Sequence, residues 1–382
     1  MNTFRKSTNT YVKIILFSLS MGLLVLPFTG TENAVRLAAA AFVSLFLWRL
    51  STTAAFLSFA RSFSRNLTIV RKKLSPLSRA VQSPLAYGGF IVILILLPAF
   101  LNDYYQDIMT LTGIYIVLAL GLNIVVGQAG LLNLGYVTFY AIGAYTYAIL
   151  STRLGLAFWP GLLVGAAVAA LFAFIIGLPT LRLRGDYFAI VTLGLGEITR
   201  IILNNWDALT GGPNGISRVG RPVIAGYSLH STVDFYYVIL VIVIMTVFVM
   251  NRLMTSRIGR AWIAIREDEV AAEAMGINTF RLKLLAFVVG SALAGLTGVF
   301  FAAKMAFVSP ESFTFFESVL ILCMVVLGGM GSIPGIILGA LLLITLPEIF
   351  RDFQDYRMLA FGIALVAMMV FRPQGLLGTV KK

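Results

Sequence analysis

The 382-residue chain is poor in the side chains on which most enzymes and metal sites depend. It contains one cysteine, Cys323, and one histidine, His230. One cysteine cannot form a disulfide within the chain, and one histidine nearly excludes a His–Cys metal cluster or a Ser-His-Asp triad. No Gly-Lys dipeptide occurs, so a Walker A loop is absent and the chain cannot hydrolyse nucleotide by that route. We therefore expect a protein that is not an enzyme and that binds no metal or cofactor of its own.

Charged residues are also scarce, and acidic ones are scarcer than basic ones. Only 12% of the residues are charged, whereas soluble domains have about 25%. Hydrophobic residues make up 59% of the chain, which predicts an all-α polytopic membrane protein. The net charge is +13, from 29 Lys and Arg against 16 Asp and Glu. In a membrane protein such an excess lies in cytoplasmic loops, so it does not indicate nucleic-acid binding.

Long apolar runs predict about 10 to 12 membrane segments. Two short apolar pieces within Val319–Leu346 meet at a glycine-rich junction, residues 328–335. Each piece is shorter than the roughly 20 residues that a crossing helix needs, so they form either two crossings or a re-entrant pair of half-helices. The longer candidates are Tyr11–Phe28, Val35–Leu50, Leu85–Leu101, Ile108–Val126, Leu131–Leu150, Pro160–Leu178, Tyr187–Leu203, Phe235–Met250, Leu284–Phe301 and Met358–Phe371.

The sequence divides into three regions. Residues 1–84 contain two membrane segments and a basic linker, residues 85–377 form the core, and residues 378–382 are a short tail. The first membrane segment resembles a signal peptide, but the second follows at once, so we expect the first to be retained. Nineteen of the 29 Lys and Arg residues fall on one side of the predicted membrane and seven on the other. Because cytoplasmic loops are enriched in these residues, both termini are expected in the cytoplasm.

The linker from Ser51 to Pro84 has six basic residues and no acid, which predicts a cytoplasmic position beside anionic lipid. A cysteine in place of Ser75, in a chain whose Cys323 is replaced by serine, is expected to resist membrane-impermeant thiol reagents in intact cells. The same cysteine should react fully once the cells are opened. Rapid labelling in intact cells would show that the linker lies outside, contrary to the predicted N-terminal topology.

The longest polar segment between two apolar runs is residues 252–283. Its six Lys and Arg residues place it in the cytoplasm, and its middle predicts one short helix. Glu267, Asp268 and Glu269 are expected in the first turn of that helix, where acids complement the helix dipole. Gly276 stands where a C-terminal cap belongs.

The same segment has a partial apolar stripe and a second cap. Ile263, Val270 and Ala274 are expected on one face of the short helix, and Asn278 can cap the helix that follows. A compact helix held at the cytoplasmic face suits docking to a soluble partner. An ordinary solvated loop helix fits the pattern equally well.

The segment from Gly121 to Gly135 is dense in glycine and amide side chains. Glycine lets helices approach closely, or lets a helix break and expose backbone groups to a ligand. The segment is therefore a candidate for the translocation pathway, with helix packing as the alternative. The candidate pathway residues are Asn123, Gln128, Gly130, Asn133 and Tyr136, together with Glu197 from a later span.

Two further features have both a functional and a structural interpretation. Glu197 is an acid within an apolar span, where ionisable groups are costly and suggest function, but Arg200 can pair with it three residues later. In the polar loop 204–234, a glycine-rich stretch is either a contact for an external protein or a plain turn. That stretch consists of Gly211, Gly212, Pro213, Asn214 and Gly215.

Several segments together resemble one family of membrane permeases. They read RLRGDYFAIVTLGLGEI, LTGGPNGIS, GRAWIAIREDEVAAEAMGI, FVSPESFTF, VVLGGMGS and FRPQGLL. These motifs are similar to those of the M-type permease subunit (LivM family) of high-affinity branched-chain amino acid ABC transporters. The resemblance covers about residues 85–377, whereas residues 1–84 match only in general character.

The resemblance implies an ABC importer permease for leucine, isoleucine and valine in the bacterial inner membrane. Its expected partners are a homologous H-type permease in a heterodimer, two cytoplasmic ATPase subunits, an external substrate-binding protein and membrane lipid. ATP and Mg would be used by the ATPase subunits and not by this chain. Segment 252–283 would then seat in the ATPase, because Glu-Ala-Met-Gly at 273–276 is similar to the coupling loop of importers. The expected coupling residues are Arg260, Arg266, Glu267, Asp268, Glu269, Glu273 and Gly276.

The motifs leave the substrate open. Importers of urea, short-chain amides and aromatic acids have similar permeases, so these solutes remain alternatives. A secondary transporter driven by ions is a further alternative. It would need buried ionisable groups in several spans, and only Glu197 is clearly of that kind.

Overall fold

The computed structural model describes residues 94–183, 185–224, 227–349, 362 and 375–376. The chain divides into two compact units, Met1–Gly89 and Phe90–Lys382, and all described residues belong to the second. The predicted spans Tyr11–Phe28, Val35–Leu50 and Met358–Phe371, the basic linker and the tail therefore lie outside the described residues.

The described part is mainly helical, as the all-α prediction requires. Five of its helices are long and apolar enough to cross a membrane, and the shorter helices α5, α13 and α14 accompany them. The five are α4 (Asp103–Asn123) with its π-helical continuation η2 (Ile124–Gln128), α6 (Phe158–Thr180), α7 (Asp186–Asn205), α9 (Thr232–Thr255) and α12 (Thr279–Met305). The shorter three are α5 (Val137–Leu154), α13 (Phe315–Gly328) and α14 (Ile333–Ile349).

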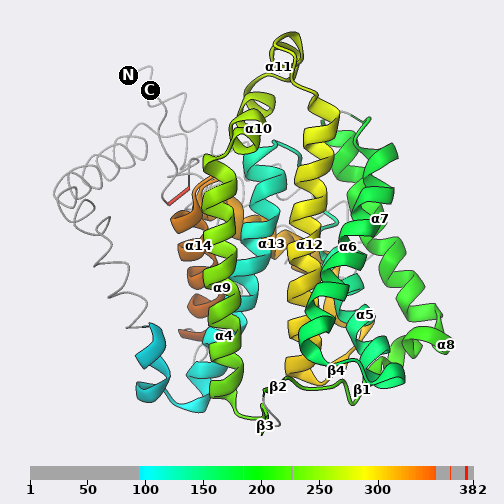
Figure 1. The fold of residues 1–382 in the computed structure, drawn as a ribbon, viewed down its shortest axis with the longest axis vertical. Coiled ribbons are helices and arrows are strands. Elements are labelled where there is room, and N and C mark those ends of the chain that lie inside the picture. Colours follow the sequence, from blue (N-terminus) through cyan, green and yellow to red (C-terminus); the bar gives the residue numbers. More distant parts are fainter. Residues whose placement is uncertain (1–93, 184, 225–226, 350–361, 363–374, 377–382) are drawn as a thin grey trace, which may run out of the picture. The chain divides into compact units, whose positions relative to one another are not determined.

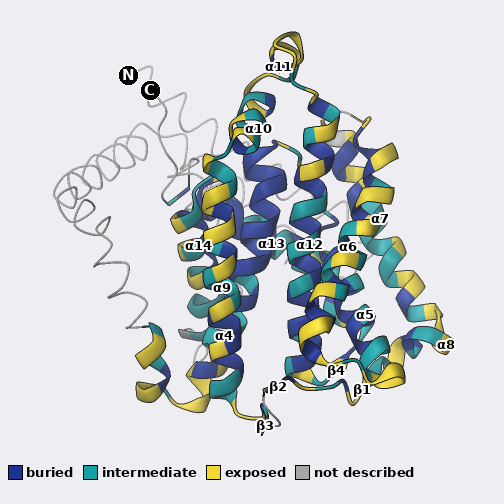
Figure 2. Cartoon of the chain, viewed as in Figure 1, coloured by how far each residue is buried: buried dark blue, intermediate teal, exposed yellow. Residues whose placement is uncertain are grey.

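Helices α4 and α12 form the centre of the bundle. Helix α12 packs against α4, α5 and α6, and α4 packs against α9, α12 and α14 (Figure 1). Of the five long helices these two are the most buried, and α7 is the least (Figure 2). The outer helices expose large apolar side chains, such as Leu163 of α6, Ile190 of α7 and Val241 of α9. Exposed apolar side chains on membrane-spanning helices suit contact with lipid or with another membrane subunit.

Glycine allows a very close helix contact between α5 and α12. A Cβ atom on Gly143 would lie 2.1 Å from the carbonyl oxygen of Gly295. A Cβ atom on Gly298 would lie 2.2 Å from the carbonyl oxygen of Tyr140. Both distances are impossible for a real side chain, so the two backbones touch only because small residues meet, as is typical of helices in membranes.

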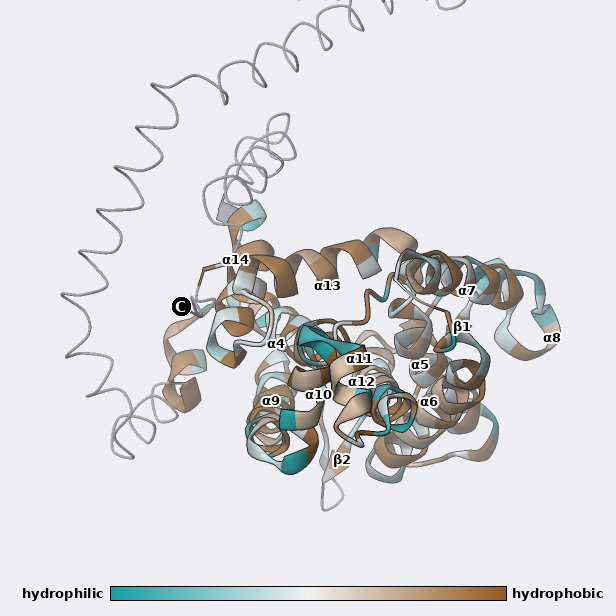
Figure 3. Ribbon diagram, turned by 90° about the horizontal axis from the view of Figure 1, so that it is seen from above, coloured by the Kyte–Doolittle hydropathy of each residue, from teal (hydrophilic) through white to brown (hydrophobic). Residues whose placement is uncertain are grey.

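The two short apolar pieces are separate helices, α13 and α14, as predicted. They are joined through Gly329 and Gly331, which have φ angles of +103° and +87°. The two helices pack against each other and against α4. Seen from above, α13 lies across the view, whereas α9 and α12 are seen nearly end-on (Figure 3). Helix α13 is therefore strongly inclined to the long helices.

The two ends of the bundle differ in structure. At one end, the segment between α9 and α12 forms α10 (Arg257–Glu267) and α11 (Glu269–Ala274) (Figure 1). At the other end lie four short strands. They are β1 (Ile216–Ser217), β2 (Val223–Ile224), β3 (Tyr227–Ser228) and β4 (Phe307–Val308), and β1 pairs with β4 and β2 with β3, both antiparallel. The same end contains α8 (Asp207–Thr210) and the 3-10 helices η3 (Gly212–Asn214) and η4 (Pro310–Phe313), while η1 (Leu97–Phe100) precedes α4.

Two predicted boundaries were wrong. The span expected at Leu131–Leu150 begins as a helix only at Val137, because Asn133 accepts a 2.9 Å hydrogen bond from Gly135 N and holds a non-helical turn. The span expected at Ile108–Val126 begins earlier than predicted, because α4 starts at Asp103, directly after Asn102. An acid at the start of a helix complements its dipole, and Asp103 has this position.

Candidate functional site

The polar segment 252–283 folds into two helices rather than the single one predicted. Glu267 ends α10, and Glu269 begins α11. Between them Asp268 has extended backbone, and its carboxylate accepts a 3.0 Å hydrogen bond from Ala271 N as the cap of α11. The three acids therefore do not share one first turn. Aspartate is a strong N-cap residue, and its capping of α11 accounts for the break.

The apolar face of α10 also differs from the predicted stripe. The buried side chains are Trp262 and Ile265, whereas Val270 and Ala274 are exposed and Ile263 is only partly buried. The predicted stripe extended across the break at residue 268, where the helical phase changes. The spacing of the buried positions is typical of one face of a helix that packs on a core.

Trp262 fixes α10 to the membrane bundle. Its side chain is fully buried, and its Nε1–H donates a 2.7 Å hydrogen bond to the carbonyl oxygen of Leu282 in α12. A second connection joins α11 to the same helix, because Lys283 Nζ lies 2.5 Å from Glu269 Oε1. The loop therefore has a defined orientation relative to α12.

The predicted caps at the end of α11 are present. Gly276 has a φ angle of +83°, and Ile277 N donates a 3.1 Å hydrogen bond to Ala272 O across it. Asn278 Oδ1 accepts a 3.0 Å hydrogen bond from Arg281 N and so caps α12. Both features follow from the sequence pattern of a glycine after one helix and an asparagine before the next.

Gly276→Val is expected to weaken ATPase association while membrane insertion stays normal. No atom lies within 4 Å of the Cβ position, so the cost is backbone strain of about 1–2 kcal/mol at positive φ. The matched control is Gly155→Val, since Gly155 also has positive φ and open space but lies at the end of α5. Co-purification of the ATPase should fall for Gly276→Val alone. Equal co-purification of both variants would contradict the prediction.

The glycine and amide segment lies at the junction of α4 with the α13–α14 turn. Asn123 Oδ1 accepts a 2.8 Å hydrogen bond from Gly331 N, and Gln128 Nε2 lies 3.5 Å from Gly331 O. Asn123, Gln128 and Asn133 are all buried. One amide atom of each, Asn123 Nδ2, Gln128 Oε1 and Asn133 Nδ2, has no hydrogen-bond partner among the described residues. Buried polar atoms without partners cost about 1–3 kcal/mol each, which marks the segment as more than close packing.

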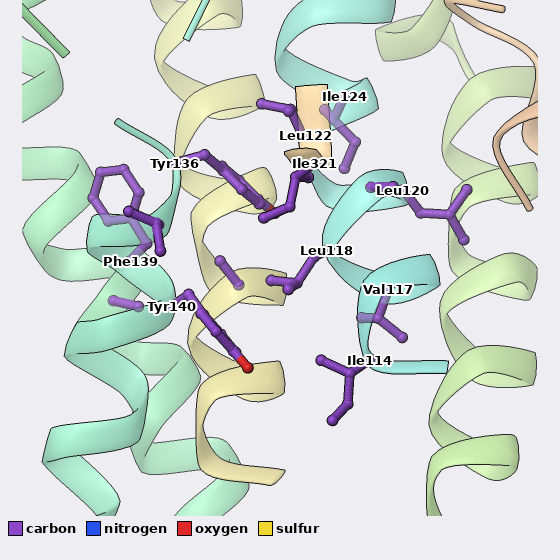
Figure 4. Packing of buried hydrophobic residues seen from close by; sticks show 14 of the residues in the cluster. Ile114, Val117, Leu118, Leu120, Leu122, Ile124, Tyr136, Phe139, Tyr140 and Ile321 are labelled. Atoms are coloured by element: carbon purple, nitrogen blue, oxygen red, sulfur yellow. The ribbon is translucent and has the colours of Figure 1, made fainter. Parts of the chain in front are cut away.

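Tyr136 connects the start of α5 to α12. Its side chain is fully buried and its hydroxyl donates a 2.8 Å hydrogen bond to Gly290 O. Figure 4 shows the Tyr136 side chain pointing between α5 and α4, toward Ile321 of α13. Within the described residues this tyrosine has a structural role.

The two segments singled out separately in the sequence meet through Arg266. The Nη1 atom of Arg266, in α10, donates a short hydrogen bond to the carbonyl oxygen of Gly127 in the π-helix. A Cβ atom on Gly130 would lie 2.8 Å from Cγ of Arg266. The structure therefore joins the loop between α9 and α12 directly to the broken end of α4. No local pattern in the sequence relates residues that are 139 positions apart.

Most of the other residues predicted to couple to the ATPase are exposed to solvent. Arg260 donates from Nη1 to Thr255 O at 2.9 Å, within the loop itself. Glu273 Oε1 accepts a 3.2 Å hydrogen bond from Thr279 Oγ1. Both residues are exposed, as are Glu267 and Asp268, so they form an accessible charged surface on α10 and α11.

Among the described residues, Glu197 has no hydrogen bond or ion pair with the other candidate pathway residues. It pairs with Arg200, whose Nη2 lies 3.0 Å from Glu197 Oε2, on the least buried of the long helices. Both side chains are more than a third exposed. The structure therefore favours the ion pair within α7.

The glycine-rich stretch 211–215 is a tight turn. Gly211, Gly212 and Gly215 all have positive φ, and a Cβ atom on Gly215 would lie 2.2 Å from Val308 O of β4. The backbone conformation and the β1–β4 pairing account for the glycines. Of these five residues, only Pro213 and Asn214 are exposed and available to another protein.

One acid of the bundle was not singled out in the sequence. Glu317, in the first turn of α13, accepts a 2.7 Å hydrogen bond from the Tyr115 hydroxyl of α4. The signal that could have indicated it is an acid followed directly by an apolar run, Ser318 to Leu327.

Gly130→Leu is expected to impair transport strongly while the protein remains in the membrane. Leucine would have to displace Arg266 and would be strained at a φ of +73°, so about 2 kcal/mol or more should be lost from this contact. Uptake into cells that contain equal amounts of variant and wild-type protein is the measurement. The control is Gly194→Leu, because no atom lies within 4 Å of that Cβ position. Normal uptake by Gly130→Leu would show that the contact is dispensable.

Comparison with known proteins identifies relatives of this chain. Residues 104–371 match the family described as "Branched-chain amino acid transport system / permease component". The chain is 47% identical to the high-affinity branched-chain amino acid transport system permease protein LivM of Escherichia coli (strain K12) over 320 residues, 78% of this chain and 75% of that protein. LivM of Salmonella typhimurium is 48% identical over the same shares. The permease protein LivH of Escherichia coli (strain K12) is 27% identical over 73% of this chain and 96% of its own length. No solved structure matches the chain.

Proposed function

The chain belongs to the permease components of branched-chain amino acid transport systems, and on that premise we propose that it forms part of the pathway of an ATP-driven importer for leucine, isoleucine and valine. The observation that supports this most strongly is the 47% identity to LivM across most of both chains. As a permease the chain is not itself catalytic. ATP and Mg are used by partner subunits in this proposal.

The proposed partners follow from the same relatives. Similarity to both LivM and LivH supports a heterodimer of this chain with an H-type permease. Two ATPase subunits would bind at the cytoplasmic face and a substrate-binding protein at the opposite face. The multi-pass chain would lie in the bacterial inner membrane.

The coupling role is assigned to α10 and α11. Their exposed charged surface would seat in a groove of the ATPase, and Trp262 and Lys283 would transmit its movement to α12. Arg266 would transmit the same movement to the broken end of α4. At the opposite end, Pro213 and Asn214 are the exposed residues proposed to contact the binding protein.

In the proposed mechanism, alternating access, the substrate site opens to each side of the membrane in turn. The buried amide groups of Asn123, Gln128 and Asn133 lie where α4 loses its helical form, and broken helices of this kind line solute sites in other transporters. A movement of α10 that shifts Gly127 would alter this segment first.

Reconstitution of the whole complex in liposomes tests the proposal. The binding protein is offered leucine, isoleucine, valine, urea or acetamide, and both ATP hydrolysis and uptake of the labelled solute are measured. The three branched-chain amino acids are expected to stimulate both. Stimulation by urea or acetamide, without any by leucine, would replace the proposed substrate.

A further inference from the structure

Glu317 is a carboxylate in the apolar bundle that lacks a basic partner. Its Oε2 accepts a 2.7 Å hydrogen bond from Tyr115, and no lysine or arginine of the described residues forms an ion pair with it. By contrast, Asp107 of α4 is paired with Lys304, whose Nζ lies 2.8 Å from Asp107 Oδ1. A partly buried acid without a cation is costly in a membrane and indicates a functional group.

A structural interpretation of Glu317 does not account for its contacts. Acids are common in the first turn of a helix because they complement the dipole. Glu317, however, directs its carboxylate to α4, and it makes no hydrogen bond to a backbone N–H of its own helix among the described residues. The acid therefore faces a neighbouring helix.

A cluster of aromatic residues includes Phe313, four residues before Glu317 in the chain. Tyr140 of α5 packs on Phe313, and its hydroxyl points from α5 toward α4 (Figure 4). The Tyr140 ring packs against two phenylalanines. Its centroid lies 5.4 Å from that of Phe301 and 5.2 Å from that of Phe313.

This combination has the chemistry of a site for a primary ammonium group next to an apolar group. An ammonium has three N–H donors, and the carboxylate and the tyrosine oxygens are acceptors. Aromatic rings attract a cation and also pack against an aliphatic side chain. A branched-chain amino acid presents both groups on adjacent carbon atoms.

We propose that Glu317, held by Tyr115 and assisted by Tyr140, binds the α-ammonium group of the amino acid during its passage, while Phe301 and Phe313 contact the aliphatic side chain. The inference rests on the proposed function, because it requires a substrate with an α-ammonium group. It adds a substrate-binding residue that belongs to neither the coupling loop nor the amide segment.

Glu317→Gln tests the proposal in the complete complex in liposomes, with binding protein and leucine. The substitution keeps the shape and removes the charge. Leucine uptake is expected to fall at least tenfold, whereas leucine-stimulated ATP hydrolysis and the half-saturating concentration of loaded binding protein stay within twofold of wild type. Tyr115→Phe should give an intermediate loss. The matched control is Glu311→Gln, since Glu311 is exposed in η4 six residues away, and its uptake should not change.

Glu317→Asp separates a binding role from a structural one. Aspartate retains the charge and should restore uptake to within about threefold of wild type. Uptake by Glu317→Gln within twofold of wild type would overturn the proposal. Parallel loss of assembly and ATP hydrolysis, with Glu317→Asp no better than Glu317→Gln, would also overturn it in favour of a structural role. Failure of the wild-type complex to transport leucine would instead refute the proposed function.

Discussion

Arg266→Glu is expected to reduce leucine-stimulated ATP hydrolysis and uptake by about tenfold to a hundredfold. The guanidinium of Arg266 donates to Gly127 O and also lies 3.2 Å from Glu267 Oε1. A hydrogen bond from a charged group contributes about 1.5–3 kcal/mol, and each 1.4 kcal/mol is a factor of ten in an equilibrium. Glutamate would lose that bond and place a second carboxylate beside Glu267 and a carbonyl oxygen.

Arg257→Glu is the matched control for this substitution. Arg257 is exposed at the start of the same helix, so the change in charge is identical while the contact with α4 is retained. We expect it to lose less than threefold in either assay. If Arg266→Glu supported uptake at the rate of Arg257→Glu, the link between α10 and the end of α4 would have no role in transport.

Trp262→Ala is expected to release α10 from the bundle. Removing a fully buried tryptophan costs about 3–5 kcal/mol, and the substitution also leaves Leu282 O without its donor. The loss should be local, because Trp262 packs beneath a loop while the long helices keep their own contacts. Limited proteolysis within residues 252–283 should therefore accelerate by about a hundredfold, and ATPase association should be lost.

Trp262→Phe separates the two contributions of this side chain. Phenylalanine retains most of the apolar contact and lacks the Nε1–H donor, so a cost of about 1–2 kcal/mol and roughly tenfold faster proteolysis are expected. If Trp262→Ala were cleaved as slowly as wild type, the tryptophan would not be the anchor of α10.

The sequence predicted the long helices and the positions of breaks more reliably than the contacts between them. Apolar runs directly indicate membrane helices, and the glycines at 127–130 and 328–335 indicated interruptions that are present. The predicted apolar face of α10 was wrong because the prediction continued a single helix across residue 268. The cap at Asp268 restarts the helix there, so side chains before and after it do not share a face.

Local sequence patterns could not predict the contacts between helices across the bundle. The pairs Arg266–Gly127 and Tyr115–Glu317 join residues 139 and 202 positions apart. Each depends on how inclined helices meet, and a single sequence has no periodicity that reports it. The Glu197–Arg200 pair was predictable, since its partners are one helical turn apart.

The π-helical turn at the end of α4 fixes the number of residues that this region must contain. Ala129 N bonds to Ile124 O, five residues back, so residues 124–128 contain one residue more than an α-helical turn would hold. Each residue of an α-helix turns the chain by about 100° and advances it by about 1.5 Å. Loss of one residue here would therefore rotate the Gly127 carbonyl away from Arg266 and draw the start of α5 toward α4. A natural insertion or deletion at this point would alter coupling and pathway together, so this turn is the part of the chain where relatives of different length are least interchangeable.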